Sequence, residues 1–195
     1  MQRKPTAERQ QEIEGAVLDL IATEGAQGLT MARIAARIGV SEAALYRHFR
    51  GKLDIIHATI AAVFDQVMNA LTQAARGGGS VVTRLRRVFV VHLRFIEEHP
   101  GMAHILFSDE IHFNAPELRR ELDARVKRLL GFVADLLTSG VESGELSKGL
   151  DVDAAAALYL GLIQTQLLLW SVNGKRGKLT AGADRVWTLY EGAIK

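Results

Sequence analysis

The apolar positions of the first fifty residues predict three short helices. Their helical spacing indicates a first helix over about 7–24, a second over 30–39 and a third over about 41–50. Gly39 is suited to the left-handed residue that ends the second helix, and the side chain of Ser41 can cap the third. A tight glycine-containing junction between two short helices is typical of a helix-turn-helix.

Longer amphipathic patterns occupy the rest of the chain. No alternating strand pattern and no internal repeat occurs, and the run of glycines at 77–79 predicts a flexible linker. The expected fold is therefore all-α with about nine helices: an N-terminal helix-turn-helix module followed by a helical core. The further helices are predicted over about 51–75, 85–96, 102–108, 118–137, 153–172 and 183–194.

Composition narrows the possible functions. The 195 residues are 48% hydrophobic and 24% charged, which is ordinary for a folded globular protein. The absence of cysteine excludes disulfides, thiolate zinc sites and iron–sulfur clusters. The net charge of +2 comes entirely from residues 1–52, where eight Lys and Arg face six Asp and Glu. That small excess favours a nucleic-acid partner only if the basic side chains gather on one surface.

The segment TMARIA at 30–35, the segment GVSEAALYRHF at 39–49 and Lys52 together resemble the DNA-binding segment of the TetR family of transcriptional regulators. The resemblance covers about forty-five N-terminal residues. It implies a DNA-binding domain over 1–52 and a ligand-sensing and dimerisation domain over 53–195. It also implies a regulator, here interpreted as a repressor, that binds a palindromic operator as a homodimer and is released by a small apolar or amphipathic effector.

The residues of the third predicted helix suit major-groove recognition. Its first turn offers small or polar side chains, while Leu45 and Phe49 point the other way as anchors. By resemblance, Tyr46, His48 and Lys52 contact phosphates, and the residues of the first turn face bases. Arg3 and Lys4 form either a DNA-binding arm or a frayed tail. The predicted DNA-binding residues are Thr30, Ser41, Glu42, Ala43, Ala44, Tyr46, Arg47, His48 and Lys52.

The helical core contains side chains suited to a ligand cavity, although ordinary packing explains its aromatic residues equally well. Gln164 is the most informative, because an amide inside an apolar helix must find a hydrogen-bond partner. The predicted ligand-binding residues are Phe64, His92, Phe95, His104, Phe132, Gln164 and Trp170.

The last two predicted helices, 153–172 and 183–194, are the candidates for the dimer interface. Small residues allow close helix approach, and Leu168 and Leu169 add apolar area. Trp187 and Tyr190 suit a partner-facing position, the alternative being burial inside one subunit.

Other classes of function are less well supported. No metalloprotease, phosphate-loop or nucleophile-elbow motif occurs, so neither an enzyme nor a cofactor is expected. No metal site is expected either, since the cluster His99, His104, Asp109, Glu110 and His112 lacks helical ligand spacing. The uncharged stretch 154–174 is long enough for a membrane span, but its central polar residues favour burial among helices in a cytoplasmic, nucleoid-associated protein.

A second interpretation of the function keeps the DNA-binding domain but gives the helical core a different role. The segment 41–49 also resembles the nucleoid occlusion factors, which are TetR-fold proteins that bind DNA and engage the cell-division polymer. A closed cavity in the core favours the sensor, whereas a filled core with an exposed groove favours the scaffold.

Overall fold

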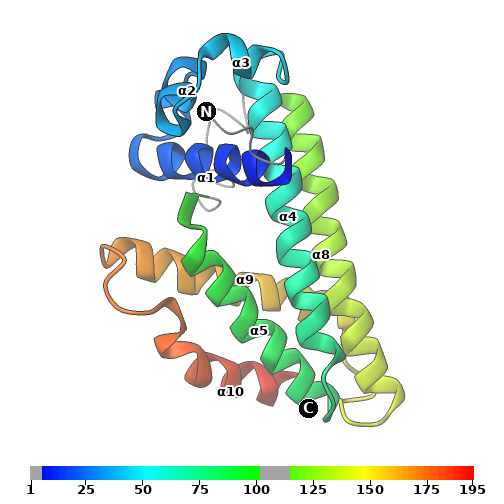
Figure 1. The fold of residues 1–195 in the computed structure, drawn as a ribbon. Helices are drawn as coiled ribbons and strands as arrows, with labels where there is room; N and C mark the ends of the chain where they lie inside the picture. The colour runs from blue at the N-terminus through cyan, green and yellow to red at the C-terminus, as the bar shows by residue number, and fades with distance from the viewer. Residues whose placement is uncertain (1–5, 102–114) are drawn as a thin grey trace. The chain divides into compact units, whose positions relative to one another are not determined.

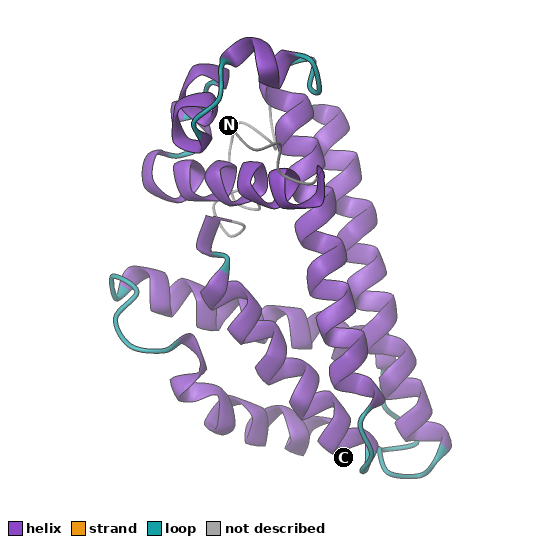
Figure 2. Ribbon diagram, viewed as in Figure 1, coloured by secondary structure: helices purple, strands orange, loops and turns teal. Residues whose placement is uncertain are grey.

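The protein is described here by a computed structural model that covers residues 6–101 and 115–195. These residues form eight α-helices, two short 3₁₀ helices and no strand (Figures 1 and 2). The all-α prediction is confirmed, and the helix expected over 102–108 lies outside the described residues. The α-helices are α1 (Thr6–Glu24), α2 (Met31–Ile38), α3 (Glu42–Tyr46), α4 (Lys52–Arg76), α5 (Val81–Glu98), α8 (Pro116–Glu142), α9 (Val152–Val172) and α10 (Ala183–Ile194), and the 3₁₀ helices are η1 (Ala26–Gly28) and η2 (Leu179–Gly182).

The chain divides into two compact units. The first comprises the described residues of Met1–Gln66 and His99–Leu122, and the second comprises Val67–Glu98 and Asp123–Lys195. Both α4 and α8 therefore contribute residues to both units. This division by packing differs from the predicted functional boundary at residue 52, because the first fifteen residues of α4 pack with the N-terminal helices.

The first unit has a mainly aliphatic core. Ile21, Ile34 and Ile56 are almost completely buried, on α1, α2 and α4 respectively. Glu14 is also buried, and its carboxylate accepts a hydrogen bond of 3.1 Å from the Gln66 side chain. Burial raises the pKa of Glu14, because the low-dielectric interior disfavours its charged form.

The second unit is built around aromatic rings. The helices α5, α9 and α10 pack against one another (Figure 1). Each supplies at least one ring to a buried cluster of Phe89, Tyr159, Trp187 and Tyr190. Neighbouring ring centroids lie 5.4–6.3 Å apart, mostly tilted or edge to face. The buried Tyr190 hydroxyl donates a 3.0 Å hydrogen bond to the carbonyl of Ala155, which joins α10 to α9.

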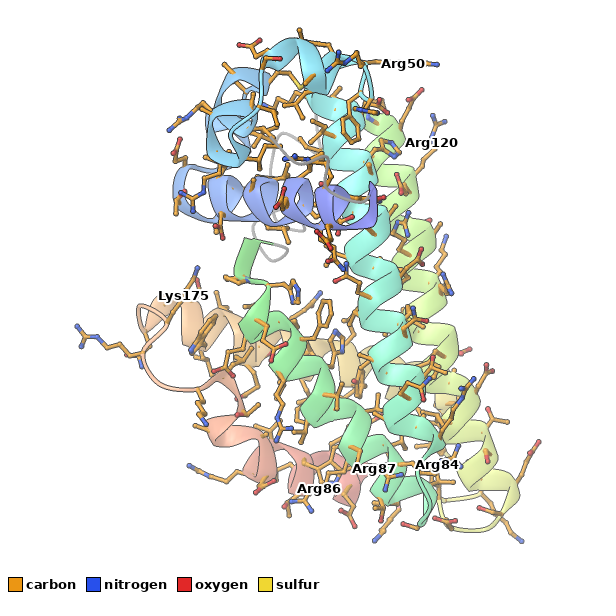
Figure 3. The ribbon with its side chains drawn as sticks, in the orientation of Figure 1. Arg50, Arg84, Arg86, Arg87, Arg120 and Lys175 are labelled. Carbon is orange, nitrogen blue, oxygen red and sulfur yellow. The ribbon has the colours of Figure 1, made fainter. Side chains whose placement is uncertain are left out.

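The glycine run between α4 and α5 is not the flexible linker expected from its composition. The guanidinium of Arg87 donates to the carbonyls of Ala74, Gly77 and Gly78 at 3.1, 2.6 and 2.8 Å. Arg84 donates to the carbonyl of Ala75 at 2.8 Å. Figure 3 shows Arg84 and Arg87 together at this end of α5. The two arginines satisfy the free carbonyls at the end of α4, where their positive charges also suit the helix dipole.

Two helices, α4 and α9, are long and apolar enough to cross a membrane by length and composition alone. Core helices of globular proteins often pass this test. Half of the apolar window of α4 is buried in the structure, compared with 28% of that of α9, so α9 exposes much more of its apolar surface.

Candidate DNA-binding site

The turn between α2 and α3 is specified by three local interactions. The Thr30 hydroxyl accepts a 3.2 Å hydrogen bond from the Arg33 amide and caps α2. Gly39 ends α2 with φ of 69°, a left-handed conformation that costs glycine little. The Ser41 hydroxyl accepts a 3.2 Å hydrogen bond from the Ala44 amide and caps α3. The caps and the left-handed glycine predicted from the sequence are confirmed.

The helix α3 presents one face to the interior and the other to solvent. Leu45 is buried at 2% exposure and anchors α3, and Phe49 is half-buried beyond it. Tyr46 is 53% exposed. Thr30, Ser41, Glu42, Ala43, Arg47 and His48 are exposed as well, whereas Ala44 and Lys52 are half-buried. The predicted DNA-binding residues therefore lie within one unit, along α3 and its two flanking turns, except for Thr30 at the start of α2.

The third helix is shorter than predicted. It ends at Tyr46, and the amides of His48 and Phe49 both donate to the carbonyl of Leu45 at 2.9 Å, so Arg47 and His48 stand in a turn. The chain turns early because α4 starts at Lys52 and is capped by Asp54, whose carboxylate accepts from the Arg50 amide at 2.9 Å. Asp54 is not among the residues predicted from the sequence, although an acidic residue in the first turn of a helix is a recognisable capping signal.

The basic residues of this unit fall into two groups. Arg33 pairs with Glu24, and Arg37 pairs with Asp19 at 2.8 Å, and both pairs tie α2 to α1. Arg47 and Arg50 are exposed and form no ion pair with any described residue. Figure 3 shows Arg50 extending outward at the turn between α3 and α4. Positive charge that no described residue compensates therefore lies at the exposed end of the helix-turn-helix, where phosphate contacts are needed. Arg119 and Arg120 of α8, in the same unit, are exposed and form no ion pair with a described residue either.

The predicted ligand-binding residues are not gathered in one place. Phe64 is buried in the first unit, His104 lies outside the described residues, and the other five belong to the second unit. The side chain of Gln164 is exposed, because the buried face of α9 passes through Ile163 and Leu167. The hydrogen-bond partner expected for its amide stays a prediction. Phe95, Phe132 and Trp170 are half-buried, and the Trp170 indole donates to the Gly177 carbonyl at 3.0 Å.

Among the predicted ligand-binding residues that the structure describes, only His92 has a polar partner inside the core. Its Nδ1 lies 3.2 Å from the buried hydroxyl of Tyr159, which sequence reasoning missed because it looked like an ordinary core aromatic. Burial lowers the pKa of His92 to about 4, so the imidazole is neutral at neutral pH. A neutral imidazole and a phenol form a polar pair within an apolar interior, where hydrogen bonds orient groups strongly.

Two grooves lie on the surface of the second unit. The larger, of about 550 Å³, is lined by α9, η2 and α10, and the smaller, of about 400 Å³, by the start of α5 and the end of α10. Neither groove is lined by a residue of the predicted ligand-binding set. Among the described residues no group of three or more His, Asp or Glu is placed to hold a metal ion.

The expectation that Trp187 and Tyr190 face a partner is wrong. They are 2% and 1% exposed, because both rings complete the aromatic cluster of their own chain. The exposed apolar side chains of this region are others: Leu158, Leu168, Leu169 and Val172 on α9 and Leu189 on α10.

A capped two-helix turn with an exposed outer face, and with arginines at its end that pair with no described residue, defines a helix-turn-helix DNA-binding protein. Residues 15–59 match the family model of bacterial regulatory proteins of the tetR family, and residues 78–177 match that of the tetracyclin repressor-like C-terminal domain. The chain belongs to the TetR family and is a DNA-binding transcription regulator.

The similar proteins include nucleoid occlusion factors and regulators of fatty acid metabolism. A nucleoid occlusion factor, SlmA of Photobacterium profundum, is 28% identical over 190 residues, 95% of either chain. The fatty acid metabolism regulator protein of Bacillus subtilis is 25% identical over 183 residues, 94% of either chain. The crystal structure of the regulator FadR from Bacillus subtilis in complex with stearoyl-CoA has a TM-score of 0.83 at 25% identity, covering 95% of this chain and 99% of that one. These relatives are named as regulators or DNA-associated factors, not as enzymes.

Proposed function

We propose that this protein is a cytoplasmic, dimeric repressor that binds a palindromic operator and leaves it when a long-chain acyl thioester binds. The observation that carries the DNA-binding half is the exposed outer face of α3, held by the buried Leu45 and by caps at Thr30 and Ser41. Such a face offers small side chains to base edges and the flanking Tyr46, Arg47, His48 and Lys52 to phosphates.

The ligand class is supported by the relative that was solved with stearoyl-CoA. An acyl thioester is amphipathic, as expected for a core that combines apolar walls with a few polar groups. His92 and Tyr159 are the polar pair proposed to meet its polar part, and Phe95 and Phe132 are proposed as apolar walls. The continuous helix α4 starts at Lys52 and reaches the second unit, so a ligand that displaces α4 also displaces a DNA contact.

The DNA-binding half is tested by separating phosphate contacts from base contacts. Lys52→Ala and Tyr46→Phe are expected to weaken binding to all sequences alike, and Lys52→Ala to reduce the slope of log affinity against log salt by about one unit. Substitutions at Glu42 or Ala43 are expected to change which operator is preferred in a selection from random DNA. A sequence preference altered by Lys52→Ala would contradict the assignment.

The ligand half is tested by titrating operator-bound protein with stearoyl-CoA, with stearate and coenzyme A as controls. Release by the thioester alone is expected, and by linkage its size is set by the unequal affinity of the ligand for the two states, typically about 1–3 kcal/mol. Tyr159→Phe and His92→Gln are expected to weaken release without changing operator affinity in ligand-free protein. If both variants release DNA at the same stearoyl-CoA concentration as the wild type, these two residues do not belong to the ligand site.

Nucleoid occlusion is the second candidate, favoured by relatives that are 28% identical over 95% of the chain. The ring-filled interior of the second unit and its two surface grooves also favour this candidate by the criterion set out from the sequence. Its core would bind a protein of the division machinery instead of a metabolite. The two candidates differ in a direct measurement: the sensor releases DNA on binding stearoyl-CoA, whereas the scaffold stays on DNA and recruits the division polymer in co-sedimentation.

A further inference from the structure

Two arginines at the start of α8 belong to the first unit but not to the helix-turn-helix. The residues of α8 up to Leu122 pack with the N-terminal helices. Leu118 and Leu122 are 2% and 6% exposed, so they anchor this part of α8 in the core of the unit. Arg119 and Arg120, which we call the α8 arginine pair, are exposed on its outer side. Among the described residues no carboxylate pairs with either of them.

A contact between α4 and α8 sets the level of the α8 arginine pair. The imidazole of His57 on α4 meets the carboxylate of Glu121 on α8. His57 lies five residues after Lys52, where α4 starts, and Glu121 lies five residues after Pro116, where α8 starts. Five residues of helix rise by about 7.5 Å, and both helices start at the same end of the unit (Figure 1). The two helices therefore start at about the same level.

This level is also that of a proposed DNA contact, because Lys52 is one of the residues proposed to bind phosphate. Packed helices lie about 8–10 Å apart, and a DNA strand advances about 3.4 Å along its axis per nucleotide. The α8 arginine pair therefore stands roughly three nucleotides of DNA backbone away from Lys52. Figure 3 shows Arg50 and Arg120 extending outward at the end where α4 and α8 start.

The acidic side chains of this surface leave it positive. Asp54 accepts a 2.9 Å hydrogen bond from the Arg50 amide, and Glu121 is engaged by His57. Glu117 is exposed one turn before Arg120 and pairs with no described residue. Two arginines against one such acid leave a net positive charge at the start of α8.

We propose that the α8 arginine pair binds phosphates of the operator backbone beyond those reached by the helix-turn-helix. This inference rests on the DNA binding of the proposed function and adds a second element to the contact. A guanidinium group donates through a planar fork that matches the oxygens of a phosphate. Phosphate contacts fix the position of a protein on DNA without reading bases, so the pair contributes affinity and no sequence preference.

Neutral substitutions test the contact in the full-length protein, with a duplex selected from random DNA by the wild type as the probe. Arg119→Gln/Arg120→Gln is expected to raise the Kd about tenfold at low salt. It is also expected to reduce the slope of log affinity against log salt by about two units. A repeated selection should return the same sequence, and the melting temperature should not change, because both side chains are exposed.

Two further variants separate a contact from general attraction. Glu117→Gln removes a negative charge beside the phosphates and is expected to lower the Kd about twofold. Arg176→Gln/Lys178→Gln removes two positive charges from exposed positions of the second unit and is expected to leave the salt slope unchanged. If this control reduces the slope as much as Arg119→Gln/Arg120→Gln does, long-range attraction accounts for the effect and the proposed contact is wrong.

Uncharged methylphosphonates at single positions of the duplex locate the contact. Each phosphate bound by the α8 arginine pair should weaken wild-type binding about threefold when it is neutralised. The same positions should have no effect on Arg119→Gln/Arg120→Gln, and they should differ from the positions whose effect is lost in Lys52→Ala. Identical methylphosphonate profiles for the wild type and Arg119→Gln/Arg120→Gln would overturn the inference.

The outcome also distinguishes this inference from the proposed function on which it rests. If Lys52→Ala reduces the salt slope and Arg119→Gln/Arg120→Gln does not, the helix-turn-helix binds DNA as proposed and α8 does not contribute. If neither variant reduces the slope, the proposed docking of the helix-turn-helix fails as well. Unchanged DNA binding together with weaker binding to poly-L-glutamate would assign the α8 arginine pair to an acidic protein and overturn the DNA contact.

Discussion

The two compact units use opposite arrangements of polar and apolar groups. In the first unit the core is mainly aliphatic, and the groups with assigned chemistry stand outside, on the exposed face of α3. In the second unit the rings of Phe89, Tyr159, Trp187 and Tyr190 fill the interior, and the polar pair His92 and Tyr159 is buried among them. A unit that reads DNA keeps its chemistry on the surface, whereas a unit that responds to a ligand needs polar groups inside.

The largest expected change in stability follows from removing a ring of the aromatic cluster. Trp187→Ala removes a 2% exposed ring that contacts Phe89 and Tyr190, and should destabilise the second unit by about 3–5 kcal/mol. Thermal unfolding at a fixed protein concentration measures the change. The half-buried Trp170 is the matched control, and Trp170→Ala should cost clearly less. Equal losses for the two tryptophans would mean that the cluster is not the centre of this unit.

Acidification should affect the two units with opposite sign. Burial lowers the pKa of His92 to about 4 from an ordinary 6.5, so only the unfolded chain binds a proton between these values. The contribution of His92 to the free energy of unfolding is therefore complete above pH 6.5. It is lost as the pH falls to about 4, which lowers the free energy of unfolding by about 3 kcal/mol in total. Glu14 has a raised pKa, so its contribution is present at low pH and is lost as the pH rises through its folded-state pKa.

Denaturant unfolding at several pH values measures this difference. His92→Gln keeps a hydrogen-bonding group beside Tyr159 and should reduce the loss of stability between pH 6.5 and about 4, which we call the acid limb. Glu14→Gln should remove the loss of stability that Glu14 causes as the pH rises. An acid limb that persists unchanged in His92→Gln would show that another group causes it.

A smaller effect is expected at the turn of the helix-turn-helix. Gly39 has φ of 69° and open space where a Cβ would stand, so Gly39→Ala meets only the conformational penalty, about 1–2 kcal/mol. Gly15 lies within α1 with equal space, and Gly15→Ala should instead stabilise by about 0.5–1 kcal/mol. Chemical denaturation of the two variants should give changes of opposite sign; a stabilising Gly39→Ala would contradict the left-handed turn.

The smallest expected effect is a gain in stability. The buried hydroxyl of Thr59 has no hydrogen-bond partner among the described residues, so Thr59→Val should stabilise the first unit by about 1 kcal/mol. In the second unit the Thr72 hydroxyl donates to the carbonyl of Met68 at 2.7 Å, and Thr72→Val should not stabilise. The two melting temperatures give the comparison, which fails if both variants shift in the same direction.

The sequence predicted the first unit better than the second for a physical reason. The caps at Thr30 and Ser41 and the turn at Gly39 depend on residues at most five positions apart, so short-range spacing contains the information. The side on which a helix residue is buried depends on distant partners. Gln164 and Trp187 share amphipathic patterns with their neighbours, and only the packing of α5, α9 and α10 decides that the first is exposed and the second buried.

The hold of Arg84 and Arg87 on the end of α4 also has a mechanical consequence. Three successive glycines normally invite proteases, insertions and hinge bending. Here four carbonyls between Ala74 and Gly78 are bound by two guanidinium groups of α5. The connection between α4 and α5 should therefore resist limited proteolysis and stay rigid. We expect α4 and α5 to move together, with any hinge lying in other parts of the chain.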